Sequence, residues 1–308
     1  MIHSYKSQKA WNFLAIVAST FSPSTDLYYS LLNYLMYEIK NNLDQNIVKR
    51  ANYVFARLLR IYEMKRKQIP TEEEIAHIEN MKPIMFPIYF FSNSHTLVAS
   101  ESYTTVKELK SSIMNKLVLL VSKVPYYSLY EVCTKELVTE ERFIDETDRI
   151  VDVISVWARE MDDYMQKNQK IDFRIYLKLL IFYDYKMDEI DTITMVYIQT
   201  NYDIIRGKLD LEKNDVYDLG ALQLMVNYQQ DSEIAYKFLN RNIFDYIPMN
   251  MFDSEERVNW IKNIFEKYRD LPEYTKLEAK AKYIELLAKN PLFQAHHFNV
   301  KVRNFYYY

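Results

Sequence analysis

The chain has 308 residues, of which 49% are apolar, and a formal net charge of −3. This length corresponds to about two domains with cores of useful size. The near-neutral balance argues against a general nucleic-acid binder and against a polybasic membrane anchor. No stretch approaches the ~18 apolar residues of a membrane-spanning helix, so we expect no transmembrane segment. The single cysteine, Cys133, excludes an internal disulfide and fits a reducing compartment.

Glycine is scarce and narrows the range of functions. Only Gly207 and Gly220 occur, whereas an average usage of ~7% would supply roughly 22. Phosphate-binding loops, dinucleotide fingerprints and nucleophile elbows all need closely spaced glycines. No histidine or cysteine pattern forms a zinc motif. We therefore expect a mainly helical, non-enzymatic chain with no catalytic residues, metal or cofactor.

Residues 8–67 predict helices. Pro23 interrupts the first, and Ser24 or Thr25 can cap the next. The clearest helix runs from Ile47 to about Lys65, and its helical wheel separates an apolar face from a basic face. The predicted apolar face consists of Ile47, Ala51, Tyr53, Val54, Phe55, Leu58, Ile61 and Tyr62. The predicted exposed basic face, with a lysine just beyond the helix, consists of Lys49, Arg50, Arg57, Arg60 and Lys67.

A short helix follows Pro70. Thr71 can accept the amide proton of Glu74, and Glu74 can reach back to the helix start, as in a capping box. After Pro83 the sequence becomes β-rich, and the segments at 84–91 and 97–101 predict a hairpin.

A second capping box, Thr105 with Glu108, opens a helix that is expected to reach about Leu120. Residues 126–134 predict a further strand. Hairpin, helix and strand in this order open a ubiquitin-like β-grasp lobe. From about Ile171 to Lys289 the chain is expected to be helical, and residues 297–302 predict a short strand.

Three stretches carry a family resemblance. The first runs from Trp11 to Ser24 and resumes, after the basic helix, from Arg66 to Ile75; the second runs from Pro87 to Leu109. The third is the most specific and comprises Asp188-Glu189, Gln199, Asp203–Gly207, Asp215 and Leu219–Leu224. In this order they resemble the C-terminal half of MyTH4 and the F1 and F2 lobes of FERM, as in the MyTH4–FERM tandem of unconventional-myosin and certain kinesin tails.

The resemblance implies a mainly α fold with a small α+β lobe. It implies a partial MyTH4 helical bundle over 1–80, a ubiquitin-like F1 lobe over 81–165, a helical acyl-CoA-binding-protein-like F2 lobe over 166–290, and the first strand of F3 over 291–308. Gly220 replaces the first alanine of a family Leu-Ala-Ala-Leu motif, which predicts close helix packing there. The structural F2 residues implied by the resemblance are Gln199, Gly207, Leu219, Ala221, Leu222 and Gln223.

The resemblance further implies a non-catalytic cytoskeletal scaffold or motor-tail module that binds protein partners. A basic surface is associated with microtubule binding in the MyTH4 family, and tubulin is acidic, so the basic face is a candidate microtubule site. An ordinary solvated helix face remains the alternative for those residues. The alternative function is a FERM-type membrane–cytoskeleton linker that binds phosphoinositide.

The expected location is cytoplasmic and cytoskeleton-associated, with the cilium as a candidate. The expected partners are cytoskeletal proteins, with tubulin the candidate, and cargo or assembly proteins, but not nucleic acid. The first helices offer Trp11, Leu14 and Phe55 with few partners nearby in sequence. The chain is therefore expected to belong to a longer polypeptide or to a larger complex.

Overall fold

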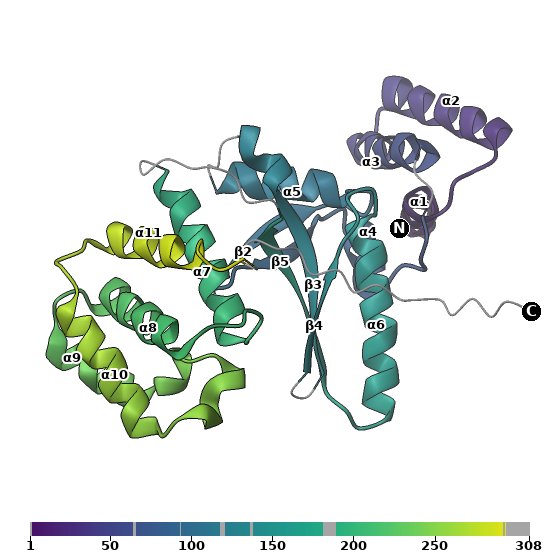
Figure 1. Ribbon diagram of the computed structural model, residues 1–308. Coiled ribbons are helices and arrows are strands. Elements are labelled where there is room, and N and C mark those ends of the chain that lie inside the picture. The colour runs from purple at the N-terminus through teal and green to yellow at the C-terminus, as the bar shows by residue number, and fades with distance from the viewer. Residues whose placement is uncertain are drawn as a thin grey trace, which may run out of the picture. The chain divides into compact units, whose positions relative to one another are not determined.

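The computed structural model describes residues 2–63, 66–92, 94–117, 121–135, 138–180, 189–291 and 293. The chain divides into two compact units, Met1–Lys178 and Leu179–Tyr308. Figure 1 shows helices in both units and one mixed sheet in the first. The predicted fold class, mainly α with a small α+β lobe, is confirmed.

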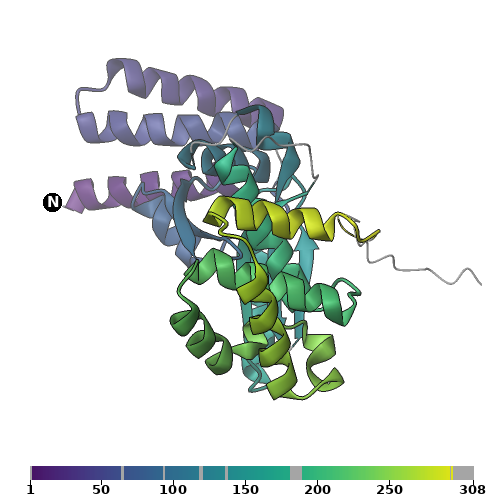
Figure 2. The ribbon, with the colours of Figure 1, turned by 60° about the vertical axis from the view of Figure 1, so that its left-hand side comes forward.

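The first unit begins with helices α1 (Ile2–Thr20), α2 (Thr25–Asn41), α3 (Gln45–Glu63) and α4 (Glu72–Glu79). α3 lies between α1 and α2 and packs against both (Figure 2). The predicted apolar face of α3 is confirmed, because four of its members are buried and the other four are partly buried against them. Tertiary burial of such a face stabilises an amphipathic helix more than its intrinsic propensity does.

The two predicted capping boxes have different outcomes. Thr71 Oγ1 accepts the Glu74 N–H at 3.2 Å, as predicted. The Glu74 carboxylate, however, binds Arg66 instead of reaching back, because a guanidinium is a stronger partner than a backbone amide. The box formed by Thr105 and Glu108 is complete, and it starts helix α5 (Val106–Lys116).

The sheet contains strands β1 (Ile84–Tyr89), β2 (His95–Ser100), β3 (Tyr127–Lys135), β4 (Val138–Phe143) and β5 (Ile171–Leu179), in the spatial order β2-β1-β5-β3-β4. The pairs β1–β2 and β3–β4 are antiparallel, whereas β1 and β5 run parallel. This is the β-grasp arrangement that the sequence predicts. The β1–β5 ladder is short and starts at Ile88, since Pro87 has no N–H to extend it.

Helices cover the sheet and complete the lobe. α5 packs on β2 and β3 through residues such as Leu109, Ile113 and Met114, which are fully buried. A short 3₁₀ helix, η1 (Val121–Tyr126), leads into β3, and α6 (Ile150–Gln166) follows β4. Trp157 of α6 stacks on Phe173 of β5, with ring centroids 5.1 Å apart.

The prediction that the chain is helical from Ile171 onward is wrong, because residues 171–179 form the central strand β5. Apolar residues alternate there with Asp172 and Arg174, the period of a strand, and that signal was present in the sequence. The sheet lobe therefore continues through β5 instead of ending near residue 165.

The second unit contains α7 (Ile190–Ile205), α8 (Lys213–Tyr228), α9 (Ser232–Arg241), α10 (Arg257–Asp270) and α11 (Lys276–Leu287), with the 3₁₀ helices η2 (Ile243–Asp245) and η3 (Met249–Ser254). α8 packs against α9, α10 and α11, and all its residues from Leu219 to Val226 are buried. The strand predicted at 297–302 lies outside the described residues.

Candidate binding surface at the joint of helices and sheet

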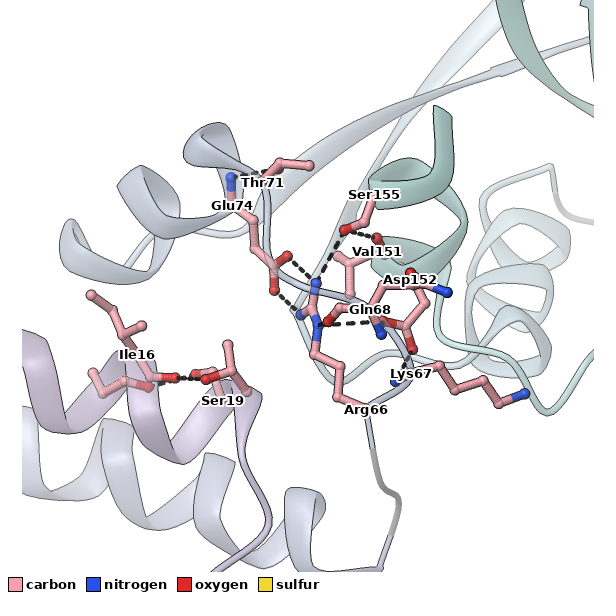
Figure 3. Close-up of polar contacts among 12 residues, drawn as sticks. Ile16, Ser19, Arg66, Lys67, Gln68, Thr71, Glu74, Val151, Asp152 and Ser155 are labelled. Atoms are coloured by element: carbon pink, nitrogen blue, oxygen red, sulfur yellow. Dashed lines mark hydrogen bonds and ion pairs between the residues drawn. The ribbon is translucent and has the colours of Figure 1, made fainter. Parts of the chain in front are cut away.

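The segment between α3 and α4 is fastened to α6 through Arg66 (Figure 3). Two N–H groups of Arg66 bind the two carboxylate oxygens of Glu74, with Nη2 2.6 Å from Oε2. Arg66 Nε lies 3.3 Å from Asp152 Oδ1. The side chains of Arg66, Glu74 and Asp152 are 2%, 2% and 6% exposed, so water screens these charges little.

Asp152 also holds the backbone of this segment. Its two carboxylate oxygens accept the N–H groups of Lys67 and Gln68, each at 3.1 Å. Arg159, about two turns further along α6, donates to Gln68 Oε1 at 2.5 Å. Charge-assisted hydrogen bonds therefore hold the segment between α3 and α4 against α6 of the sheet lobe.

A second contact joins α3 to the lobe directly. Arg57 binds Glu101, just after β2, and Arg60 binds Glu108 in α5. The Arg57 side chain is only 3% exposed, and its guanidinium carbon lies 3.2 Å from the centroid of the Tyr53 ring. Burial raises the pKa of Tyr53 to about 12, although Arg57 acts in the opposite direction.

The prediction of an exposed basic face is wrong for Arg57, which is buried in this contact. Arg60 is partly exposed, and Glu108 neutralises its charge. The physical reason is that α3 has partners on two sides: its apolar side faces α1 and α2, and Arg57 and Arg60 on its basic side face carboxylates of the sheet lobe. The helical wheel identifies the two sides and cannot identify what covers them.

The other three predicted basic residues remain closer to solvent. Lys49 is exposed and makes no hydrogen bond or ion pair within the described part of the chain. Arg50 is half-buried, and its Nη1 donates to Asn12 Oδ1 at 2.6 Å. Lys67 is exposed and pairs with Asp148, and this hydrogen bond raises the pKa of Lys67.

A groove of about 610 Å³ lies between α3 and the lobe. Apolar side chains line part of it, among them Ala56 and Leu59 of α3, Pro83 and Ala99. Arg60, Glu101 and Glu108 supply its charged lining. Burial acts to raise the pKa of Glu108, but hydrogen bonds from Thr105 and Arg60 outweigh it and lower the pKa below its ordinary value. Sequence reasoning missed this groove because it forms only where two separately predicted parts meet.

In the second unit, the two glutamines of the predicted F2 motif bind backbone groups. Gln199 Oε1 accepts the N–H of Leu179 at 2.7 Å, and Gln199 Nε2 donates to the carbonyl of the same residue at 3.1 Å. Gln223 Nε2 donates to the Asp245 carbonyl at 2.9 Å. These bonds satisfy the buried amide side chains and tie α7 to the end of β5 and α8 to the end of η2.

The remaining F2 motif residues have packing environments. Leu219, Ala221 and Leu222 are buried in α8. Gly207 follows the end of α7 with φ +67°, a left-handed conformation that favours glycine. A Cβ at Gly220 would lie 3.1 Å from Ile264 of α10, so the predicted close helix packing is found.

Within the described ranges, no three His, Cys, Asp or Glu side chains are grouped as a metal site would require. Over the same residues, none of the helices has the length and apolar character needed to cross a membrane.

Three family models match consecutive parts of the sequence. The MyTH4 domain matches residues 2–77, the RA like domain matches residues 82–181, and the FERM central domain matches residues 184–298. Together they extend over nearly the whole chain, in the order that the sequence resemblance indicated.

Curated relatives include a kinesin-like protein and myosin heavy chains. The chain is 21% identical to the kinesin-like protein KIN-14I of Oryza sativa subsp. japonica over 95% of its own length, and 22% identical to a myosin-I heavy chain of Dictyostelium discoideum over 96%. It covers only 24% and 13% of those two proteins. The chain thus spans about a quarter or less of the relatives it matches.

Solved structures share the fold. The MyTH4-FERM MF1 domain of Dictyostelium discoideum myosin VII (mutant 2) superposes with a TM-score of 0.78 at 21% identity, covering 92% of this chain and 57% of that one. The human myosin 7b C-terminal MyTH4-FERM domain, in complex with the harmonin-a PDZ3 domain, superposes with a TM-score of 0.69 at 20% identity, covering 93% and 57%. The chain therefore carries a MyTH4 domain match followed by RA-like and FERM central domain matches, and it shares the fold of the MyTH4-FERM domains of these myosins.

Proposed function

We propose that the chain is a non-catalytic, protein-binding module of a cytoskeletal motor or scaffold. The observation that carries this proposal is the joint at Arg66, where buried ion pairs hold the MyTH4-like helices and the sheet lobe in one fixed arrangement. A rigid composite surface suits the recognition of a protein, because little ordering is left to be done on binding. The similarity to myosins and to a kinesin supports a cytoskeletal setting.

The proposal includes a protein partner, cytoplasmic location and a division into lobes. The related myosin 7b module is seen with a PDZ domain, which supports a protein as the kind of ligand. We propose a MyTH4-like lobe over residues 1–80 and an F1-like lobe that starts at residue 81 and includes β5. An F2-like lobe follows and ends at residue 290. The F3 strand over 291–308 stays a prediction.

Microtubule binding rests on a narrower basis than the sequence indicated. Arg57 and Arg60 are held by Glu101 and Glu108, which leaves Lys49, with Arg50 beside it, as the accessible cations of α3. We therefore limit the candidate tubulin contact to the first turns of α3. The cilium remains a candidate location.

Pelleting assays test the proposal. The purified chain is sedimented with microtubules, with actin filaments and with phosphoinositide-containing vesicles. The double variant Lys49→Glu/Arg50→Glu is compared with Lys40→Glu, which reverses an exposed charge on α2. Microtubule binding that falls with salt and is lost only in the double variant supports the tubulin contact. Binding to vesicles alone favours the membrane-linker alternative, and binding to none of the three overturns the cytoskeletal assignment.

Nucleotide turnover tests the non-catalytic part of the proposal. Hydrolysis of ATP or GTP by the purified chain should not exceed that of a heat-denatured control. Turnover above that control, which also co-elutes with the chain, would contradict a purely binding function.

A further inference from the structure

The outer strands of the described sheet, β2 and β4, differ in charge. β4 carries Glu140, Glu141 and Arg142, and charged side chains on an outer strand discourage pairing with another chain. β2 contains no lysine, arginine, aspartate or glutamate. The side chains of β2 itself therefore oppose strand addition less than those of β4 do.

The outward backbone groups of β2 follow from its ladder with β1. The Phe90 N–H donates to the Ser94 carbonyl at 2.9 Å, and hydrogen-bonded pairs alternate along an antiparallel ladder. This alternation directs the N–H and C=O of Ala99 away from β1. It also directs the Leu97 carbonyl outward, and Lys116 Nζ donates to that carbonyl at 2.5 Å, in agreement with the assignment.

The groove between α3 and the lobe begins where the β2 edge ends, because Ala99 belongs to both. Ala56 and Leu59 of α3 are exposed there and offer apolar surface. Glu101 and Glu108 are 31% and 44% exposed. Glu101 Oε2 binds Arg57, whereas its Oε1 accepts no hydrogen bond from any described residue.

Both carboxylates that line the groove have a guanidinium partner: Glu108 binds Arg60, and Glu101 binds the buried Arg57 through Oε2 alone, which leaves its Oε1 for a further cation. An unoccupied carboxylate oxygen beside apolar side chains is complementary to a cation with small apolar neighbours. An acidic segment would instead place like charges next to Glu101.

We propose that the Ala99 edge and this groove bind an extended segment of a partner protein that carries a lysine or arginine between small apolar residues. The segment adds to β2 as a strand through the backbone of Ala99. Its cation reaches Glu101, and its apolar neighbours contact Ala56 and Leu59. This inference rests on the proposed protein-binding function and specifies the site and the chemistry of the partner.

A peptide titration tests the site. The probe is a fluorescent peptide in which valine and threonine alternate around one central lysine. Comparison peptides replace the lysine with glutamate or introduce a proline beside it, which removes an N–H needed for strand addition. On the protein, Ala56→Trp fills the groove, and Ala76→Trp is the matched control at an exposed alanine of α4.

We expect the lysine peptide to bind about tenfold or more tightly than either comparison peptide. Its anisotropy change should weaken as salt is raised, be lost with Ala56→Trp and persist with Ala76→Trp. Equal affinity of the lysine and glutamate peptides, or equal binding by the two tryptophan variants, overturns the inference. If Ala56→Trp does not fold, the three peptides on the unmodified chain decide the question.

The outcome is separable from that of the proposed function. Failure of the lysine peptide to bind, with polymer or vesicle binding retained, overturns the groove site alone. Failure of the peptide together with loss of all binding in the pelleting assays overturns both.

Discussion

Replacing Arg66 with methionine tests whether the joint is as strong as its geometry indicates. The change removes the cation and leaves Glu74 and Asp152, which are 2% and 6% exposed, as buried carboxylates without their partner. Breaking one partner out of a buried pair costs about 3–5 kcal/mol. In a unit of this size each kcal/mol lowers the melting temperature by about 2–4 °C, so we expect a fall of about 6–20 °C.

The assay must resolve the first unit, since a chain with two compact units need not unfold in a single step. Site-resolved hydrogen exchange in α4 and α6 should lose protection in Arg66→Met. The matched control is Arg174→Met, which removes a surface pair with Asp172 that contributes about 0–1 kcal/mol. Equal losses in the two variants would refute the reasoning. The triple variant with Glu74→Gln and Asp152→Asn should recover part of the loss, because neither of these two side chains then carries a buried negative charge.

Three further predictions concern other parts of the fold. Leu222→Ala should lower the free energy of unfolding of the second unit by about 2–5 kcal/mol in urea titrations, whereas Val258→Ala at an exposed site should change it by less than about 0.5. Gly220→Ala should lower the free energy of unfolding of the second unit by about 1 kcal/mol, although alanine has the better helix propensity, because the new Cβ would lie 3.1 Å from Ile264. An unchanged urea midpoint would show that the Ile264 side chain moves aside without cost. Burial raises the pKa of Tyr53 to about 12, so as the pH rises the unfolded chain loses the Tyr53 phenol proton before the folded chain does. The free energy of unfolding should therefore fall between about pH 10 and 12, and it should fall less steeply in Tyr53→Phe. The same pH dependence in both proteins would show that Tyr53 is not the cause.

Local patterns in the sequence predict local structure well in this chain. The capping box at Thr105 and Glu108 needs only neighbouring residues, and it is found intact. The apolar face of α3 is found buried because its period alone determines which side avoids water. The strand β5 contradicts the expected helix, although the alternation of apolar and charged residues at its start has the period of a strand.

The joint, which is the cluster of Arg66, Glu74 and Asp152, could not be predicted from local sequence patterns. The helix-side half of the cluster, Arg66 with Glu74, lies within one short stretch, but Asp152 comes from a helix far along the chain. No periodicity links residues that meet only after the sheet has formed. The groove has the same origin, because Ala56 and Ala99 come from parts that the sequence presents as separate domains.

Whether a basic residue of α3 is exposed depends on its position along the helix axis, which a helical wheel does not show. The wheel projects every residue onto one circle, so Lys49 and Arg57 fall on the same side whatever their distance along the axis. In the structure the axial position decides: Lys49 in the first turns is exposed, whereas Arg57 two turns later meets Glu101. A basic helix side is therefore available to a partner only over the part that the rest of the chain leaves uncovered. For this chain that part begins near Lys49 and ends before Arg57, which is why charge reversal at Lys49 tests partner binding while charge reversal at Arg57 tests folding.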